Sequence, residues 1–297
     1  MQSTHHACSV STVRRGKADL NKIGAMGGLG RSVRKNLRNV WGDLQADLYS
    51  RGALSVKDLA LPDFLGIGAQ KAGTTWLYAN LRCHPDIFLP DKKELHYFDR
   101  RFHRSLRSYA RYFEAGAGKV KGEITPSYAA LAPSRIRYIR SIMPETKLIF
   151  MMRNPIDRAW SQALMNLVVR DKQAFDAVSD QAFLDHFRHE RSIIRGDYNR
   201  ILDHWLAVFP KEQMLVGFFE DISERPTEIL TQVFDHIGVS RDVDWTAFPC
   251  QQVVHSGVGA RLPAKFRAEL ERIYEPEIEQ LMEQFGSRIS HWRRAKL

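Results

Sequence analysis

Short apolar runs alternate along this chain with longer segments in which apolar residues recur at helical spacing. The short runs predict strands at residues 64–67, 120–123, 147–152 and 214–219. Strands that alternate with helices build βαβ units. The pattern therefore predicts an α/β fold whose central, mostly parallel sheet is flanked by helices on both faces. The helices are expected to begin near Thr74, Pro133, Pro155, Phe175, Asn199, Pro226 and Pro263.

The chain before this domain divides into two parts. Residues 1–27 are polar and dotted with glycine, which predicts a disordered leader. Residues 28–61 form an expected helical extension, and the main domain is expected to occupy 62–297. Within 28–51 we expect an amphipathic helix that packs against its own domain, although contact with a membrane surface or a partner stays open. Its apolar stripe is Val33, Leu37, Val40, Trp41, Leu44 and Leu48, and its basic face holds Arg31, Arg34, Lys35 and Arg38.

Composition bounds the class of protein. The 297 residues are 44% hydrophobic, enough for a buried core, and no run approaches the length of a transmembrane helix. Cys8, Cys83 and Cys250 are far apart and predict neither a zinc site nor a disulfide framework, so a cytoplasmic location is expected. The net charge of +10 favours an anionic partner such as a nucleotide, an acidic glycan, nucleic acid or a lipid surface, unless it only solvates the surface.

The stretch GAQKAGTT, residues 68–75, joins the first strand to a helix. Backbone N–H groups at such a junction surround a phosphate, and Gly68 and Gly73 would allow close approach. In a P-loop the lysine follows the second glycine, whereas Lys71 lies two residues before Gly73. The displacement argues against an ordinary kinase and for an anion held without an obligatory metal.

A second strand runs into a helix at KLIFMMRNPIDRAWSQALM, residues 147–165. Arg153 closes the strand, and Ser161 follows it by two helical turns, so both could bind one group. Two separate junctions of this kind predict a ligand with two separated phosphate-like groups.

QKAGTTWLYANL followed by RNPIDRAWS resembles the paired motifs of sulfotransferases that use 3′-phosphoadenosine 5′-phosphosulfate (PAPS). The resemblance spans about residues 62–292 and implies a three-layer P-loop-like fold, with PAPS as donor and no metal. It assigns Arg153 and Ser161 to the 3′-phosphate, and Arg261 in HSGVGARLP is a further expected contact. The residues implied at the 5′-phosphosulfate are Lys71, Ala72, Gly73, Thr74, Thr75 and Trp76.

The segment LPDKKELHYFDRRF, residues 89–102, resembles the K-E-x-H-F-F-D block of heparan-sulfate-type sulfotransferases. The resemblance implies that Glu94 is the base that removes the acceptor proton, with His96 and Asp99 beside it. Glu123 in KGEITPSY is the alternative base, and Lys71 would stabilise the leaving oxygen. Simpler structural roles for Glu94, His96 and Glu123 stay open.

The resemblance leaves the acceptor open between a glycan and a small molecule, and between a hydroxyl and an amine. Absence of an anchor and of a disulfide favours a soluble bacterial relative over a Golgi enzyme.

Two other functions stay as alternatives. A P-loop kinase would require magnesium, and a basic nucleic-acid-binding protein would show a basic strand face interleaved with aromatic residues, which the sequence lacks. Oligomeric state is not predicted.

Overall fold

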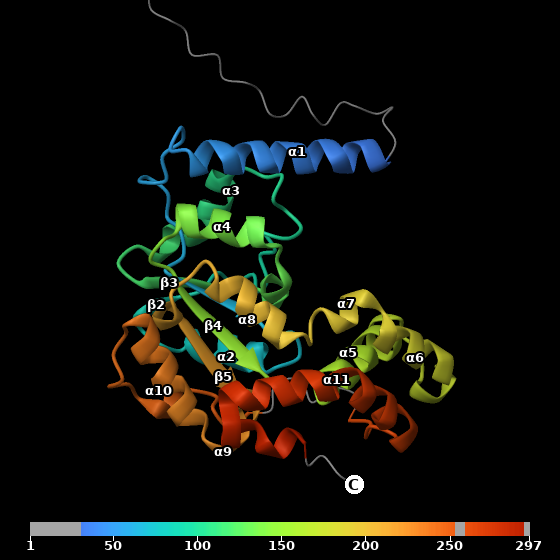
Figure 1. The fold of residues 1–297 in the computed structure, drawn as a ribbon. Coiled ribbons are helices and arrows are strands. Elements are labelled where there is room, and N and C mark those ends of the chain that lie inside the picture. Colours follow the sequence, from blue (N-terminus) through green and yellow to red (C-terminus); the bar gives the residue numbers. More distant parts are fainter. Residues whose placement is uncertain (1–30, 253–258, 294–297) are drawn as a thin grey trace, which may run out of the picture.

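The structure is a computed structural model that describes residues 31–252 and 259–293. The expected leader, 1–27, lies outside these residues. Five parallel strands form one sheet in the order β2-β3-β1-β4-β5, which confirms the predicted α/β fold (Figure 1). The strands are β1 (Phe64–Gly68), β2 (Ile87–Phe88), β3 (Val120–Ile124), β4 (Lys147–Met152) and β5 (Met214–Phe218).

The central strands are buried along their length. Every residue of β1 is buried, and so are five of the six in β4, which explains why both read as continuous apolar runs rather than alternating ones. The edge strand β2 was not predicted because its two residues are too few to show a period. The expected strand 214–219 is one residue too long, because a helix begins at Phe219.

Helices cover the sheet and carry most of the remaining chain. The outermost is α1, which lies along α4, whereas α10 packs on β4 and β5 and α11 packs across α5, α6 and α8 (Figure 1). None of the described helices is long and apolar enough to span a bilayer. The α-helices are α1 (Arg31–Ser50), α2 (Thr74–Leu81), α3 (Leu106–Ala110), α4 (Pro133–Ile142), α5 (Pro155–Ala163), α6 (Asp180–Arg188), α7 (Glu190–Ile193), α8 (Tyr198–Leu206), α9 (Phe219–Glu224), α10 (Pro226–Ile237) and α11 (Ala264–Phe285).

Two helix predictions need correction. The helix expected near Phe175 is a single 3-10 turn, and the α-helix begins five residues later at Asp180, where the Ser179 side chain caps it. In α1 the apolar stripe does not pack wholly against the domain, because Val40, Trp41 and Leu44 are exposed. The short helices α3, α7 and α9 were not predicted. Shorter turns are η2 (Arg111–Gly116), η3 (Pro126–Ala130), η4 (Leu164–Arg170, a π-helix), η5 (Phe175–Ala177), η6 (Lys211–Gln213), η7 (Trp245–Ala247) and η8 (Gly286–Trp292).

The strand order places a crevice between β1 and β4. From β1 the chain continues towards β2 and β3, whereas from the neighbouring β4 it continues towards β5 on the other side. Connections that leave adjacent parallel strands in opposite directions open a crevice at their carboxyl ends, where ligands of such sheets bind. The loop 69–73 and Arg153 follow the two strands at this crevice.

Candidate active site

The loop after β1 holds a conformation that only certain residues adopt. Lys71 has φ 72° and Gly73 has φ 79°, and Gly73 is the residue before the first turn of α2. A Cβ on Gly73 would lie 2.1 Å from Cδ1 of Ile222 in α9. The backbone therefore requires glycine, and a side chain at this position would also displace the end of the Ile222 side chain. The hydroxyls of Thr74 and Thr75 make no side-chain hydrogen bonds within 31–252 and 259–293, so they can donate to a ligand.

Three cations from separate parts of the chain converge at this loop. Burial lowers the pKa of Lys71 first, and the charges of Arg153 and Lys93 lower it further. Arg153 donates from Nη1 to the Lys71 carbonyl at 3.3 Å, and its guanidinium lies 4.4 Å from the ring centre of Phe219. Burial likewise lowers the pKa of Arg153. In the described part of the chain neither Lys71 nor Arg153 forms an ion pair within 4 Å, and the charges of Asp157 and Glu220 only partly offset the effect of burial on Arg153, so both cations can still bind an anion.

A pocket of about 310 Å³ adjoins Arg153. The Tyr198 hydroxyl donates to the Arg153 carbonyl at 2.9 Å and so fixes the backbone at the end of β4. Ser161 lies further along α5 and is half-buried, without a side-chain hydrogen bond among the described residues. The pocket is lined by Arg153, Asn154, Asp157, Phe219, Glu220, Ser223, His291 and Trp292.

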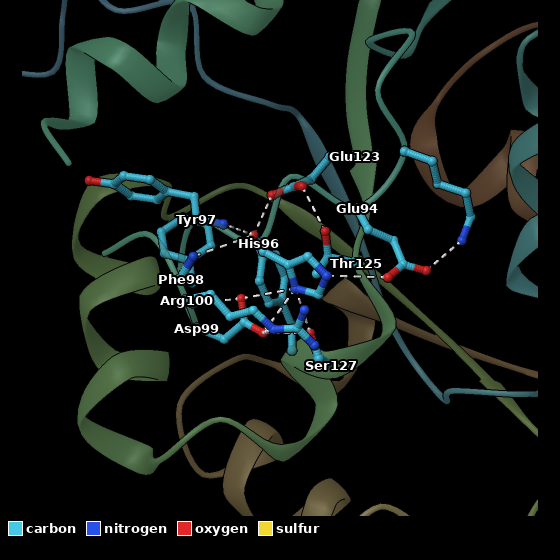
Figure 2. Close-up of polar contacts among 11 residues, drawn as sticks. Glu94, His96, Tyr97, Phe98, Asp99, Arg100, Glu123, Thr125 and Ser127 are labelled. Atoms are coloured by element: carbon cyan, nitrogen blue, oxygen red, sulfur yellow. Dashed lines mark hydrogen bonds and ion pairs between the residues drawn. The ribbon is translucent and has the colours of Figure 1, made fainter. Parts of the chain in front are cut away.

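The segment 93–99 forms a chain of alternating charges (Figure 2). Lys93 Nζ lies 2.9 Å from Glu94 Oε1, Glu94 Oε2 lies 3.3 Å from His96 Nε2, and His96 Nδ1 lies 3.0 Å from Asp99 Oδ2. Ser127 donates to the same Asp99 oxygen at 2.7 Å. Glu94 and His96 both have positive φ, 61° and 54°. Positive φ is uncommon for residues other than glycine, more so for glutamate than for histidine, and such strain is typical of functional sites.

The charges in this chain stabilise one another. The hydrogen bond from His96 lowers the pKa of Glu94 to about 2, against the effect of burial and with help from Lys93. Hydrogen bonds to Asp99 and Glu94 raise the pKa of His96 to about 9. Burial alone would raise the pKa of Asp99, but its bonds with His96 and Ser127 outweigh that effect and lower it. At neutral pH His96 is therefore a cation between two carboxylates.

Glu123 lies beneath this segment and is only 2% exposed. Its Oε1 accepts hydrogen bonds from Tyr109 at 2.6 Å and Tyr128 at 2.9 Å, and its Oε2 accepts one from Thr125 at 2.9 Å. Burial raises the pKa of Glu123 to about 7, although these hydroxyls and the Leu95 backbone N–H oppose the rise. The carboxylate is thus surrounded by protein donors.

Residues 61–251 match the family model of the sulfotransferase domain. The chain belongs to the sulfotransferase family. This confirms the predicted family and does not favour the kinase or nucleic-acid alternatives.

Two curated relatives illustrate the match of this sulfotransferase. The human heparan sulfate glucosamine 3-O-sulfotransferase 6 is 32% identical over 217 residues, covering 69% of this chain and 62% of the relative. The Dictyostelium discoideum membrane-associated sulfotransferase kil1 is 26% identical over 285 residues, covering 67% and 60%. The chain thus spans less than two thirds of either relative. A solved sulfotransferase from Alicyclobacillus acidocaldarius is 27% identical, with a TM-score of 0.65 over 80% of this chain and all of that one.

Trp76, Ala72 and Arg261 were also predicted to contact the donor, and their surroundings are as follows. Trp76 is buried, and its indole N–H donates to the Cys250 carbonyl at 2.9 Å, so it is not free for a ligand. Ala72 is fully buried in the core. Arg261 is exposed, but its neighbour Ala260 accepts a hydrogen bond from Trp160, one residue before Ser161. The segment of Arg261 therefore passes beside α5, while 253–258 lie outside the described residues.

Three contributors to the site were missed from the sequence. Lys93 adds the third cation, Ser127 holds Asp99, and Tyr109 holds Glu123. Lys93 and Ser127 stand inside the quoted motifs DKKELH and GEITPSY, so their nearness was a usable signal. Tyr109 comes from α3, and no local pattern links it to Glu123. Within the described chain no group of three or more His, Cys, Asp or Glu is placed to hold a metal ion.

Proposed function

We propose that this sulfotransferase transfers a sulfuryl group from PAPS to a hydroxyl, or an amine, of a carbohydrate acceptor. One observation carries the proposal. Lys71 and Arg153, two cations that form no ion pair in the described residues, lie at the carboxyl ends of adjacent strands. They are next to the charged segment 93–99, which contains the ionised Glu94. An anionic donor and a base are thereby brought to one crevice.

The residues around the crevice suit a donor with two anionic groups. The loop of Lys71 and Gly73, with the free hydroxyls of Thr74 and Thr75, would hold the 5′-phosphosulfate. Arg153 and Ser161 would hold the 3′-phosphate. When bound, PAPS supplies a sulfuryl group attached to a good leaving group. Lys71, whose charge has no carboxylate partner, would then stabilise the negative charge that gathers on the departing oxygen.

Glu94 is better suited than Glu123 to act as the base. The Glu94 side chain is 38% exposed and ionised, so an acceptor can approach it, although its bonds to His96 and Lys93 hold its pKa at about 2 and so weaken it as a base. Glu123 is enclosed by three hydroxyls and has no free face. His96, which Asp99 holds in place, would orient Glu94. When Glu94 takes the proton and becomes neutral, Asp99 would still balance the positive charge of His96.

Glu123 would instead position the segment of the base. Through Tyr128 it reaches the backbone, because the Tyr128 oxygen accepts from the N–H of Tyr97 at 2.8 Å and of Phe98 at 3.4 Å. These N–H groups belong to the two residues that follow His96, the second of the two residues with positive φ. The network therefore holds the backbone in the form that aligns Glu94 with His96.

An acidic carbohydrate is the acceptor class that the surroundings favour. Arg100, Arg191 and the buried Arg158 lie near enough to Arg195 to lower its pKa in addition to burial, and Asp99 is the acid that opposes them. This arginine cluster thus lies beside the charged segment 93–99. The human relative described above carries heparan sulfate in its name, which supports a carbohydrate acceptor. A cytoplasmic location remains a proposal from cysteine usage alone.

The deciding experiment follows labelled sulfate from PAPS to an acidic glycan such as N-sulfated heparosan, in the presence of a chelator. Product formation with PAPS, together with calorimetric binding of adenosine 3′,5′-bisphosphate, would support the proposal. Phosphate transfer from ATP that requires magnesium would favour the kinase instead. Absence of any binding of the bisphosphate to the folded protein would overturn the proposal, whatever acceptor was offered.

A further inference from the structure

Apolar side chains gather on the outer side of α1. Val40 is 64% exposed, Trp41 38% and Leu44 48%, and Leu54 just beyond the helix is 41% exposed. The described chain has six exposed large hydrophobic residues, and these are four of them; Val169 and Leu206 are the others. We call Val40, Trp41 and Leu44 the α1 stripe. A grouping of this kind marks an interaction site more often than scattered exposed residues do.

The stripe is exposed although α1 is firmly seated by its opposite side. Gly42 faces inward, where a Cβ would lie 2.5 Å from Cδ1 of Phe102, and Gln45 is buried. Asp43 pairs with Arg135 of α4 at 3.4 Å, and the hydroxyls of Ser50 and Ser141 lie 3.0 Å apart. The helix therefore cannot turn its apolar stripe inward without losing these contacts.

Positive charge is concentrated at the same end of the chain. The first 38 residues contain eight Lys or Arg and a single acidic residue, Asp19, whereas the net charge of the whole chain is only +10. Four of the eight belong to the first two turns of α1, before the first acidic residue of the helix, Asp43. An apolar stripe on a helix rich in basic residues is complementary to an anionic lipid surface.

We propose that α1 docks on an anionic membrane surface, with Val40, Trp41 and Leu44 inserted at the level of the headgroups. Parallel pairing with a second copy of the chain would bring two strongly basic ends together, and antiparallel pairing is tested by the sedimentation experiment below. The proposal does not depend on which reaction the crevice catalyses.

The test is co-sedimentation of the full chain with vesicles. Vesicles made of equal parts phosphatidylglycerol and phosphatidylcholine should bind the protein, and those of phosphatidylcholine alone should bind it at least about 10-fold more weakly, with high salt reducing the difference. The triple variant Val40→Ser, Trp41→Ser, Leu44→Ser should lose about 10-fold or more of the binding to anionic vesicles. A matched control is the pair Val169→Ser, Leu206→Ser, which removes exposed apolar side chains elsewhere and should bind like the unaltered chain.

Circular dichroism of each variant checks that it is folded. If the unaltered chain does not bind anionic vesicles, or if the triple variant binds as well as it does, the proposal is wrong. Sedimentation in the absence of lipid measures the oligomeric state and so tests the alternative occupant. A dimer that the triple variant converts to a monomer would assign the α1 stripe to a second copy and would also overturn the proposal.

Discussion

Nε2 of His96 lies 3.3 Å from Oε2 of Glu94, and both residues hold positive φ to bring these atoms together. Because Glu94 is ionised and reachable, the change Glu94→Gln removes the proton acceptor while it keeps the shape of the side chain. Turnover with PAPS should fall by about 10²- to 10⁴-fold, and affinity for adenosine 3′,5′-bisphosphate should stay the same. Steady-state kinetics and calorimetry measure the two quantities.

Glu275→Gln on α11 is the matched control, since this change removes the same charge from an exposed glutamate that makes no ion pair or side-chain hydrogen bond among the described residues. It should leave turnover unaltered. If Glu94→Gln retains near-normal turnover while folded, Glu94 is not the base.

Tyr128 links Glu123 to the backbone of the catalytic segment, so Tyr128→Phe tests the positioning role. The change leaves the buried N–H of Tyr97 without its acceptor, which should lower the free energy of unfolding by about 1–3 kcal/mol. Turnover should fall, but less than in Glu94→Gln. In a Glu94→Gln background the same change should have little further effect on turnover, because only the placement of Glu94 would be lost.

Tyr112→Phe is the control, as Tyr112 is half-buried and makes no side-chain hydrogen bond in the described residues. Denaturant unfolding and kcat decide the matter when they are measured for all five proteins: the unaltered chain, the two single variants, the double variant and the control. An equal loss of turnover with and without Glu94 would show that Tyr128 does not act through Glu94.

The sequence predicts the scaffold of this site better than its detailed geometry. The strand-to-helix junctions at Gly73 and Arg153 could be found because glycine and proline mark them and buried strands precede them. The left-handed backbone at Glu94 and His96 could not, because the groups that accept from the adjacent backbone N–H groups belong to Glu123 and Tyr128, which lie far along the chain. Strain of this kind is a tertiary effect, against local preference.

The apolar pattern of α1 was read correctly as a helix that packs on its own domain, but Val40, Trp41 and Leu44 of the predicted stripe are exposed. Periodicity gives the relative placement of Val40 and Leu44 on one face, and it does not say which face meets the domain. Close packing of Gly42 against Phe102 decides that question, and this contact joins residues 60 positions apart.

Arg153→Lys should separate charge from geometry at the second junction. Lysine keeps the positive charge but loses the planar fork and the contact with the Phe219 ring. Affinity for adenosine 3′,5′-bisphosphate should fall by about 10- to 100-fold, as expected for loss of a charged hydrogen bond. Affinity for adenosine 5′-phosphate, which lacks the 3′-phosphate, should change little.

Ser161→Ala should give a smaller loss in the same direction, and Ser290→Ala in η8 serves as the control. Calorimetry with both nucleotides gives the comparison. Equal losses for the two nucleotides would place Arg153 away from the 3′-phosphate.

Gly73→Ala should destabilise the loop by two separable effects. The alanine Cβ meets Ile222 at 2.1 Å, and alanine also disfavours φ 79°. Together these should lower the free energy of unfolding by about 2–4 kcal/mol and abolish nucleotide binding. Adding Ile222→Ala should relieve the clash alone, so the double variant should lose less stability than the two single changes predict by addition. Additive losses in denaturant unfolding would show that the loop moves away from Ile222 instead.

His96 should make the stability of the protein depend on alkaline pH. Its pKa is raised in the folded state from 6.5 to about 9, so its protonated form is stabilised by Glu94 and Asp99. A raised folded pKa means that this stabilisation is fully present below pH 6.5 and is lost as the pH rises to about 9. The loss should be at most about 3 kcal/mol.

His96→Gln should lack this step, and His204→Gln on α8 should keep it. Glu123 titrates near pH 7 in all three proteins, so the difference between their unfolding free energies isolates His96. If the difference between the unaltered chain and His96→Gln is the same below pH 6.5 and above pH 9, His96 is not a cation in the folded protein.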